Sequence, residues 1–240
     1  MKKTDLRYRA CVQILKEELV PAIGCTEPIA LAYGAAVARK TLGVLPDKVE
    51  VAASGSIIKN VKSVIVPHTG HLKGISAAAA AGIVAGDAEK KLEVISYVKE
   101  EQVEEIKQFL EQTPITVEHL ESGITFDIEV TVHAGADSAK VRIANYHTNI
   151  VRIEKNGEIL ENIPVSGEEE SNLTDRSLLD MEHIWEFINT VDIEEIKPML
   201  EPQIRMNMAI AEEGMTNDYG ANIGKVIWKT QEHTTANHAR

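Results

Sequence analysis

The sequence of 240 residues has few cysteines, few basic residues and no long apolar run. Its two cysteines, Cys11 and Cys25, cannot form a disulfide framework, so we expect a protein of the reducing cytoplasm. There are 25 Lys and Arg against 37 Asp and Glu. This excess of acidic residues argues against a nucleic-acid partner, because phosphate contacts need clustered cations. No stretch approaches the roughly 18 apolar residues of a membrane span, and the charged start lacks the apolar segment of a signal peptide.

Several common functional motifs are also missing from the sequence. It has no Walker loop, no GxGxxG, no HExxH and no CxxC. Hydrophobic residues nevertheless make up 44% of the chain, which is enough to bury a core and excludes wholesale disorder.

Hydrophobic periodicity predicts an α+β fold, a body of small-residue-rich helices with an inserted antiparallel β subdomain. We expect a helical segment with a cysteine loop at 1–113, the β subdomain at 114–165, and a helical segment at 166–240 that returns to the body and ends within an element. A small-residue helix at 75–86 suits close packing between helices.

The expected elements follow from periodicity and from turn residues. Helical spacing covers 4–20, 28–42, 75–86, 98–111 and 204–215, with a further helix after Leu178 anchored by Ile184, Trp185 and Ile188. Alternation predicts strands at 48–54, 115–120, 125–132, 140–144 and 150–154, and Asn-Gly at 156–157 is a strong hairpin signal.

A cysteine precedes the second helix, in Gly-Cys-Thr-Glu-Pro at 24–28. Either Cys25 or Thr26 is expected at the helix cap, and Pro28 suits the first turn. The unpaired N–H groups of a helix start are expected to lower the pKa of the Cys25 thiol, which favours the thiolate for nucleophilic attack or metal binding. A small buried filler is the alternative, and the residues leave both open. Cys11, on an apolar helix face, is expected to be structural.

Two glycine-containing turns are further candidates for chemistry. One is Ser-Gly-Ser-Ile-Ile-Lys-Asn at 54–60, and the other is Pro-His-Thr-Gly-His-Leu-Lys-Gly at 67–74. Turns that open helices can bind anions such as a substrate carboxylate, and histidine can act as an acid or base near neutral pH. The polar side chains available are Lys59, Asn60, His68, His71 and Lys73. The alternative is a pair of ordinary turns with solvated lysines.

Three motifs together resemble those of the L-cysteine desulfidase family. They are Gly-Cys-Thr-Glu-Pro-Ile-Ala at 24–30, Ser-Gly-Ser-Ile-Ile-Lys-Asn-Val-Lys at 54–62, and His-Leu-Lys-Gly-Ile-Ser followed by five alanines at 71–81. That family is itself similar to the α chain of iron–sulfur L-serine dehydratases. The resemblance extends over the whole chain but over only about the N-terminal half of the family's length, and the combination of motifs carries it.

The resemblance implies a carbon–sulfur lyase with a 4Fe–4S cluster, held by three cysteines and open to substrate at one iron. One of these ligands corresponds to Cys25. The other two lie in the family's C-terminal half, and the chain has no cysteine after Cys25, so we do not expect it to assemble the cluster or to be active alone. L-Cysteine would lose its α-proton and its β-thiol, giving pyruvate, ammonia and hydrogen sulfide. The residues implied for the pocket are Lys59, Asn60 and Glu27, with His68 or His71 for proton transfer.

Two other functions remain as alternatives at this point. An L-serine or L-threonine dehydratase would present the same carboxylate and amine to the pocket, with water as the leaving group. A stand-alone binding or assembly module without catalysis is the second alternative. The expected partner is a small amino acid, and whether the chain forms a homo-oligomer is left open.

Overall fold

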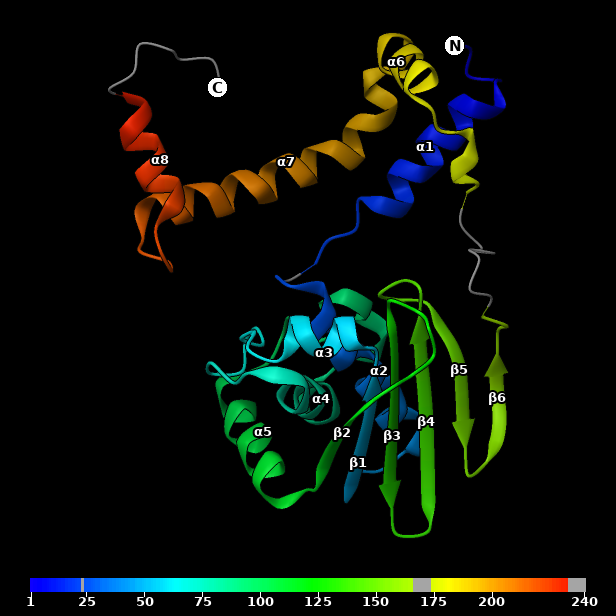
Figure 1. Ribbon diagram of the computed structural model, residues 1–240, viewed down its shortest axis with the longest axis vertical. Helices are drawn as coiled ribbons and strands as arrows, with labels where there is room; N and C mark the ends of the chain where they lie inside the picture. Colours follow the sequence, from blue (N-terminus) through cyan, green and yellow to red (C-terminus); the bar gives the residue numbers. More distant parts are fainter. Residues whose placement is uncertain (23, 166–173, 233–240) are drawn as a thin grey trace. The chain divides into compact units, whose positions relative to one another are not determined.

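The structure is a computed structural model that describes residues 1–22, 24–165 and 174–232 (Figure 1). The chain divides into two compact units, one formed by Pro21–Glu170 and the other by Met1–Val20 with Ser171–Arg240. The expected boundary at residue 166 and the last residues, 233–240, lie outside the described part. In the part of the chain that the structure describes, helices and one mixed sheet confirm the α+β class.

The unit Pro21–Glu170 is built on a six-stranded sheet in the order β2-β1-β3-β4-β5-β6. The strands are β1 (Lys48–Ala53), β2 (Ile115–His119), β3 (Asp127–Ala134), β4 (Asp137–Ala144), β5 (Ile150–Lys155) and β6 (Glu158–Asn162). Asn156 and Gly157 both have positive φ and separate β5 from β6, which confirms the predicted hairpin.

The sheet differs from the predicted subdomain in two respects. It is mixed, because β1 pairs with β2 in parallel and with β3 in the antiparallel sense. It also takes β1 from the expected helical segment, so it does not stand apart as an insertion at 114–165. The physical reason is that the buried residues of β1 (Val49, Val51 and Ala53) need sheet neighbours on both sides, and β2 and β3 supply them.

Helices cover one face of this sheet (Figure 1). They are α2 (Thr26–Leu42), α3 (Gly55–Val61), α4 (Gly74–Ala85) and α5 (Glu100–Gln112), with the 3-10 segment η1 (Ala88–Glu93). The connection from β1 to the parallel β2 runs through α3, α4, η1 and α5. Within the layer, α2 packs on β3 and β4 and also on α4, so α2 lies at the centre of the core.

The contact between α2 and α4 confirms the predicted close packing of small-residue helices. A Cβ atom at Gly82 would lie 2.0 Å from the carbonyl oxygen of Ala32, closer than any side chain tolerates. The alanines of both helices that face this contact are buried. The glycine therefore allows the backbone of α4 to approach the backbone of α2 directly.

Replacing Gly82 with alanine is expected to lower the free energy of unfolding by about 1–3 kcal/mol, since the clash is with backbone that cannot rotate away. Urea unfolding followed by circular dichroism measures the change. Gly214 is the matched control: its added Cβ has no described atom within 4 Å. There the substitution is expected to be neutral or to stabilise by up to about 1 kcal/mol. Equal losses in the two variants would contradict the close packing.

The other unit is helical, with α1 (Leu6–Glu18), α6 (Met181–Thr190), α7 (Ile193–Thr216), α8 (Ile223–Glu232) and the 3-10 turn η2 (Arg176–Leu178). Its small core contains Tyr8, Cys11, Val12, Phe187 and Ile196. The three expected anchors are wrong, because Ile184, Trp185 and Ile188 are all exposed. Phe187 is instead the buried residue of α6, with 5% of its surface exposed. Phe187 packs edge-on against Tyr8, with ring centroids 5.3 Å apart, and this contact selects the buried face of α6.

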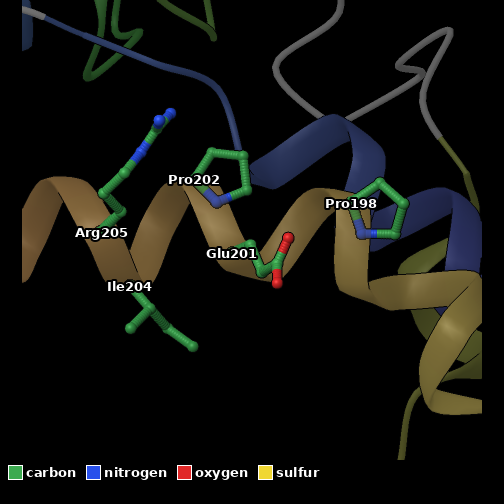
Figure 2. A pocket seen from close by; sticks show the side chains of 5 residues that line it. All are labelled: Pro198, Glu201, Pro202, Ile204 and Arg205. Carbon is green, nitrogen blue, oxygen red and sulfur yellow. The ribbon is translucent and has the colours of Figure 1, made fainter.

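The helix expected at 204–215 begins eleven residues earlier, at Ile193, and runs through Pro198 and Pro202. The two prolines are four residues apart, so they lie on one side of α7 (Figure 2). Proline has no N–H, so each proline leaves the carbonyl group four residues earlier without its helical partner. Pro198 is exposed, so water can hydrogen-bond to carbonyl groups on this side of the helix. A hollow of about 420 Å³ beside them is lined by Pro198, Glu201, Pro202, Ile204 and Arg205.

None of the helices in the described residues is long and apolar enough to cross a membrane.

Candidate functional site

One end of the sheet collects the segments that the sequence singled out. β1 ends at Ala53, which pairs with Ile128 near the start of β3, and β3 begins with Asp127 opposite Ala144 at the end of β4. The start of α3, the residues before β3 and the turn between β4 and β5 therefore lie at this end. We call it the site end of the sheet.

Helix α2 also begins at the site end. Its last residue, Leu42, accepts a hydrogen bond from the Lys155 ammonium at the end of β5, over 3.3 Å. In the middle of the helix, a Cβ at Gly34 would lie 3.3 Å from the Ile143 side chain. The helix thus packs along β3, β4 and β5, with its first turn toward the site end and its last residue at the opposite end.

The first turn of α2 carries a pair formed by a thiol and a carboxylate. Cys25 is the N-cap residue, and its side chain makes no capping hydrogen bond. Instead, the Cys25 Sγ–H donates to Glu27 Oε2 over 3.0 Å. Cys25 is exposed and Glu27 is half-buried. The buried-filler interpretation of Cys25 is therefore wrong.

The pKa of the Cys25 thiol is raised, so the expected lowering by the helix start is wrong. Atoms around the sulfur partly desolvate it, and this is the largest cause of the raised pKa; the hydrogen bond to the Glu27 carboxylate is the next. The N–H of Glu27 acts in the opposite direction, as expected of a helix start, but is outweighed. Partial desolvation and the Glu27 carboxylate therefore both favour the protonated thiol.

Asn60 joins the pair from α3. Its Nδ2–H donates to Glu27 Oε1 over 3.3 Å, so both oxygens of the Glu27 carboxylate accept a hydrogen bond. These bonds, that of Cys25 most strongly, hold the pKa of Glu27 below its usual value. The structure thus brings together three residues that the sequence analysis proposed, and Glu27 and Asn60 are 33 positions apart in the sequence. We call Cys25, Glu27 and Asn60 the site cluster.

The other proposed residues lie outside the site cluster. Lys59 is exposed on α3 beside Asn60. His68 and His71 are exposed in a loop in which both have positive φ, 59° and 69°. This loop adjoins the cysteine segment, since a Cβ at Gly24 would lie 3.6 Å from Pro67 Cγ. Within the described residues, neither histidine hydrogen-bonds to the cluster.

Sequence reasoning missed His147, which lies in the turn between β4 and β5. Its imidazole is half-buried, and its ring centroid lies 4.4 Å from that of Phe126. Its charge interaction with Glu27 links it to the site cluster. No ligand spacing or motif marks this position in the sequence, because only the sheet register brings the turn to α2.

The described residues do not provide a complete metal site. Across 1–22, 24–165 and 174–232, no group of three His, Cys, Asp or Glu side chains could hold a metal ion. Cys25 is an exposed thiol and fits as one ligand. Cys11 is buried in the core of the other unit, where burial raises the pKa of its thiol, in agreement with the structural role expected for it.

Curated relatives match most of the chain, which is similar to UPF0597 proteins. The UPF0597 protein of Desulfitobacterium hafniense is 52% identical over 230 residues, which are 96% of this chain and 54% of the relative. Those of Lachnoclostridium phytofermentans and Fusobacterium nucleatum are each 46% identical, over 92% and 93% of this chain and 52% of each relative.

The chain therefore spans about half the length of the curated relatives that it matches. Their names state no reaction and no cofactor. No family model and no solved structure matches the chain.

Desolvation and then the hydrogen bond to Glu27 raise the pKa of Cys25, and alkylation tests the contribution of the carboxylate. Glu27→Gln removes the negative charge beside the thiol, which lowers the thiol pKa and increases the thiolate fraction near neutral pH. We expect iodoacetamide to label Cys25 about two- to tenfold faster in this variant, with the rates converging at alkaline pH. Glu50→Gln, on a strand of the sheet, is the control and leaves the rate unchanged. Equal rates in Glu27→Gln and the original chain would contradict the pairing.

Proposed function

We propose that the chain is the N-terminal part of an iron–sulfur lyase of the same family as its UPF0597 relatives, which cleaves L-cysteine to pyruvate, ammonia and hydrogen sulfide. The observation that carries the proposal is the site cluster. Cys25, Glu27 and Asn60 come from two of the three motifs on which the resemblance rests, and they are joined by hydrogen bonds at the site end of the sheet.

In this proposal Cys25 is one of three thiol ligands of a 4Fe–4S cluster. Its exposure and its place at the start of α2 suit a ligand that meets a metal group from outside the unit. The remaining ligands must come from outside this chain, which has no cysteine after Cys25. When bound, such a cluster would supply a Lewis acid that polarises the leaving group of the substrate.

The chain's own residues are proposed to bind and orient the amino acid. The carboxylate of Glu27 stays ionised, because the hydrogen bonds of Cys25 and Asn60 hold its pKa low, and an anion there can receive the substrate ammonium group. Lys59, exposed next to Asn60 on α3, is the cation proposed to receive the substrate carboxylate. Asn60 fixes the Glu27 carboxylate between the two motifs.

Product analysis tests this function. The complete polypeptide that carries this sequence is reconstituted with iron and sulfide without oxygen, and is then given L-cysteine or L-serine. Sulfide and pyruvate from L-cysteine would support the proposal. Pyruvate from L-serine without sulfide from L-cysteine would replace it with the dehydratase. A protein that converts neither amino acid would contradict both and favour a non-catalytic module.

A further inference from the structure

Helix α7 extends beyond the small core of its unit. Near the start of the helix, Ile196 is buried in that core, and Leu200 is partly buried against it. From 203 to 216 the apolar side chains of the helix are exposed instead. A helix in a protein gains most of its stability from the packing of an apolar face. Among the described residues, this part of α7 has no such packing.

One exposed stripe continues the face that the core covers. Ile204, Met208 and Met215 follow Leu200 at intervals of four, four and seven residues, so they lie on the same side of α7. Their exposed fractions are between 42% and 58%. The side of α7 that packs on the core near its start is therefore open to solvent from Ile204 onward.

A second apolar pair lies on a different side of the same stretch. Met206 and Ile210 are four residues apart and exposed. Because each residue advances about 100° around the helix, the charged side chains are confined to the remaining side, which carries Arg205, Glu212 and Glu213. A helix that is apolar on most of its circumference is typical of one that is buried.

Helix α8 adds another apolar face. Ile223, Val226 and Ile227 have the spacing of one helix face, and all three are exposed. The corner between α7 and α8 is closed by a hydrogen bond from Tyr219 Oη to Glu213 Oε1 over 2.6 Å. This contact fixes how the chain turns from one exposed apolar helix into the next.

The length of the relatives indicates what covers these faces. The three relatives match this chain with only 52–54% of their own length, so the part that it does not match is nearly as long. Two copies joined through the stripe of Ile204 and Met208 would leave Met206 and Ile210 in water. A folded part of that size can cover several sides of α7 together with α8.

We propose that residues 203–230, which we call the α7–α8 segment, are the docking surface for the part of the complete polypeptide outside this chain. This rests on the proposed function, in which that part supplies the remaining cluster ligands. The docking part presents apolar side chains to the two apolar sides of α7 and to α8. Arg205 and Glu212 stay at the solvent-facing rim of the interface.

Hydrogen exchange followed by mass spectrometry tests the docking surface. Amides of the α7–α8 segment are expected to exchange at least about tenfold slower in the complete polypeptide than in the 240-residue chain, because covered helices open less often. The buried helix α4 is the internal control and exchanges at the same rate in both proteins. Equal exchange of the segment in both proteins would overturn the proposal. Protection in the 240-residue chain that rises with its concentration would assign the faces to a second copy and would also overturn it.

A double substitution on the stripe, Ile204→Lys with Met208→Lys, gives the second test. In the complete polypeptide it is expected to lower the urea midpoint and to speed exchange of the α7–α8 segment, because two charges then face an apolar interface. In the 240-residue chain it leaves both unchanged, since both side chains are already in water. Thr216→Lys, at an exposed polar position of the same helix, is the control and changes neither protein. Equal losses in the two proteins, or none in the complete polypeptide, would overturn the proposal.

The exchange measurement does not depend on turnover. Protection of the segment in a complete polypeptide that converts neither amino acid would refute the proposed function and leave the docking surface standing. Turnover without protection of the segment would overturn the docking surface and leave the proposed function standing.

Discussion

Replacing Arg142 with methionine is expected to lower the free energy of unfolding by about 3–5 kcal/mol. Arg142 on β4 holds Asp127 with two hydrogen bonds, Nε to Oδ1 at 2.9 Å and Nη2 to Oδ2 at 2.7 Å. The Asp127 side chain is 0% exposed, so the substitution leaves a buried carboxylate without a counter-charge. The lost ion pair lies at the site end of the sheet, because Asp127 begins β3 directly after Phe126. Chemical denaturation measures the change in the free energy of unfolding.

A second ion pair on the same two strands provides the control for this substitution. Lys140 pairs with Glu129 over 2.7 Å, and both side chains are partly exposed. Lys140→Met is expected to cost less than about 1 kcal/mol, because solvent replaces the lost partner. Combining Asp127→Asn with Arg142→Met should recover part of the stability, since no charge then stays buried. Equal costs for Arg142→Met and Lys140→Met would show that the Asp127 pair does not hold this end of the sheet.

Replacing Cys25 with alanine is expected to reduce sulfide release from L-cysteine to background in the complete reconstituted polypeptide. In the proposed function the thiol is an iron ligand, and alanine has no atom that can take its place. The fold should persist, because Cys25 is exposed and its side chain does not cap α2. An anaerobic sulfide assay together with circular dichroism separates loss of turnover from loss of structure.

Cys11→Ala is the matched control for Cys25→Ala. Cys11 is buried in the small core around Tyr8 and Phe187, so its replacement is expected to cost about 1 kcal/mol of stability and to leave sulfide release intact. Turnover that survives Cys25→Ala but is lost in Cys11→Ala would show that Cys11, not Cys25, is the ligand of the iron–sulfur cluster.

Local signals in the sequence were sufficient for much of the fold. The alanine and glycine content predicted close packing of small-residue helices, because small side chains allow backbones to approach, and the contact of α2 with α4 confirms it. Asn156 and Gly157 predicted the hairpin because both positions of such a turn require positive φ. The members of the site cluster could also be predicted from the sequence, because Cys25, Glu27 and Asn60 lie in motifs that resemble those of a known family.

Features set by distant contacts could not be predicted in this way. The place of β1 between β2 and β3 depends on pairing with strands far away in the sequence. The raised pKa of Cys25 depends on a side-chain bond to Glu27, which the helix-start argument does not contain. His147 lies at the site end because of the register of the sheet strands, which the sequence around it does not reveal. The length of α7 was missed because prolines usually end helices, whereas α7 continues through Pro198 and Pro202.

The proposed function makes Cys25 a ligand of an iron–sulfur cluster whose other ligands lie outside this chain. The most direct measurement is the rate at which Cys25 is alkylated, followed by mass spectrometry of its peptide, before and after anaerobic loading with iron and sulfide. We expect that loading protects Cys25, that a chelator restores its labelling, and that labelling of the buried Cys11 is slow throughout. Equal labelling of Cys25 before and after the protein has bound iron and sulfide would contradict its role as an iron ligand.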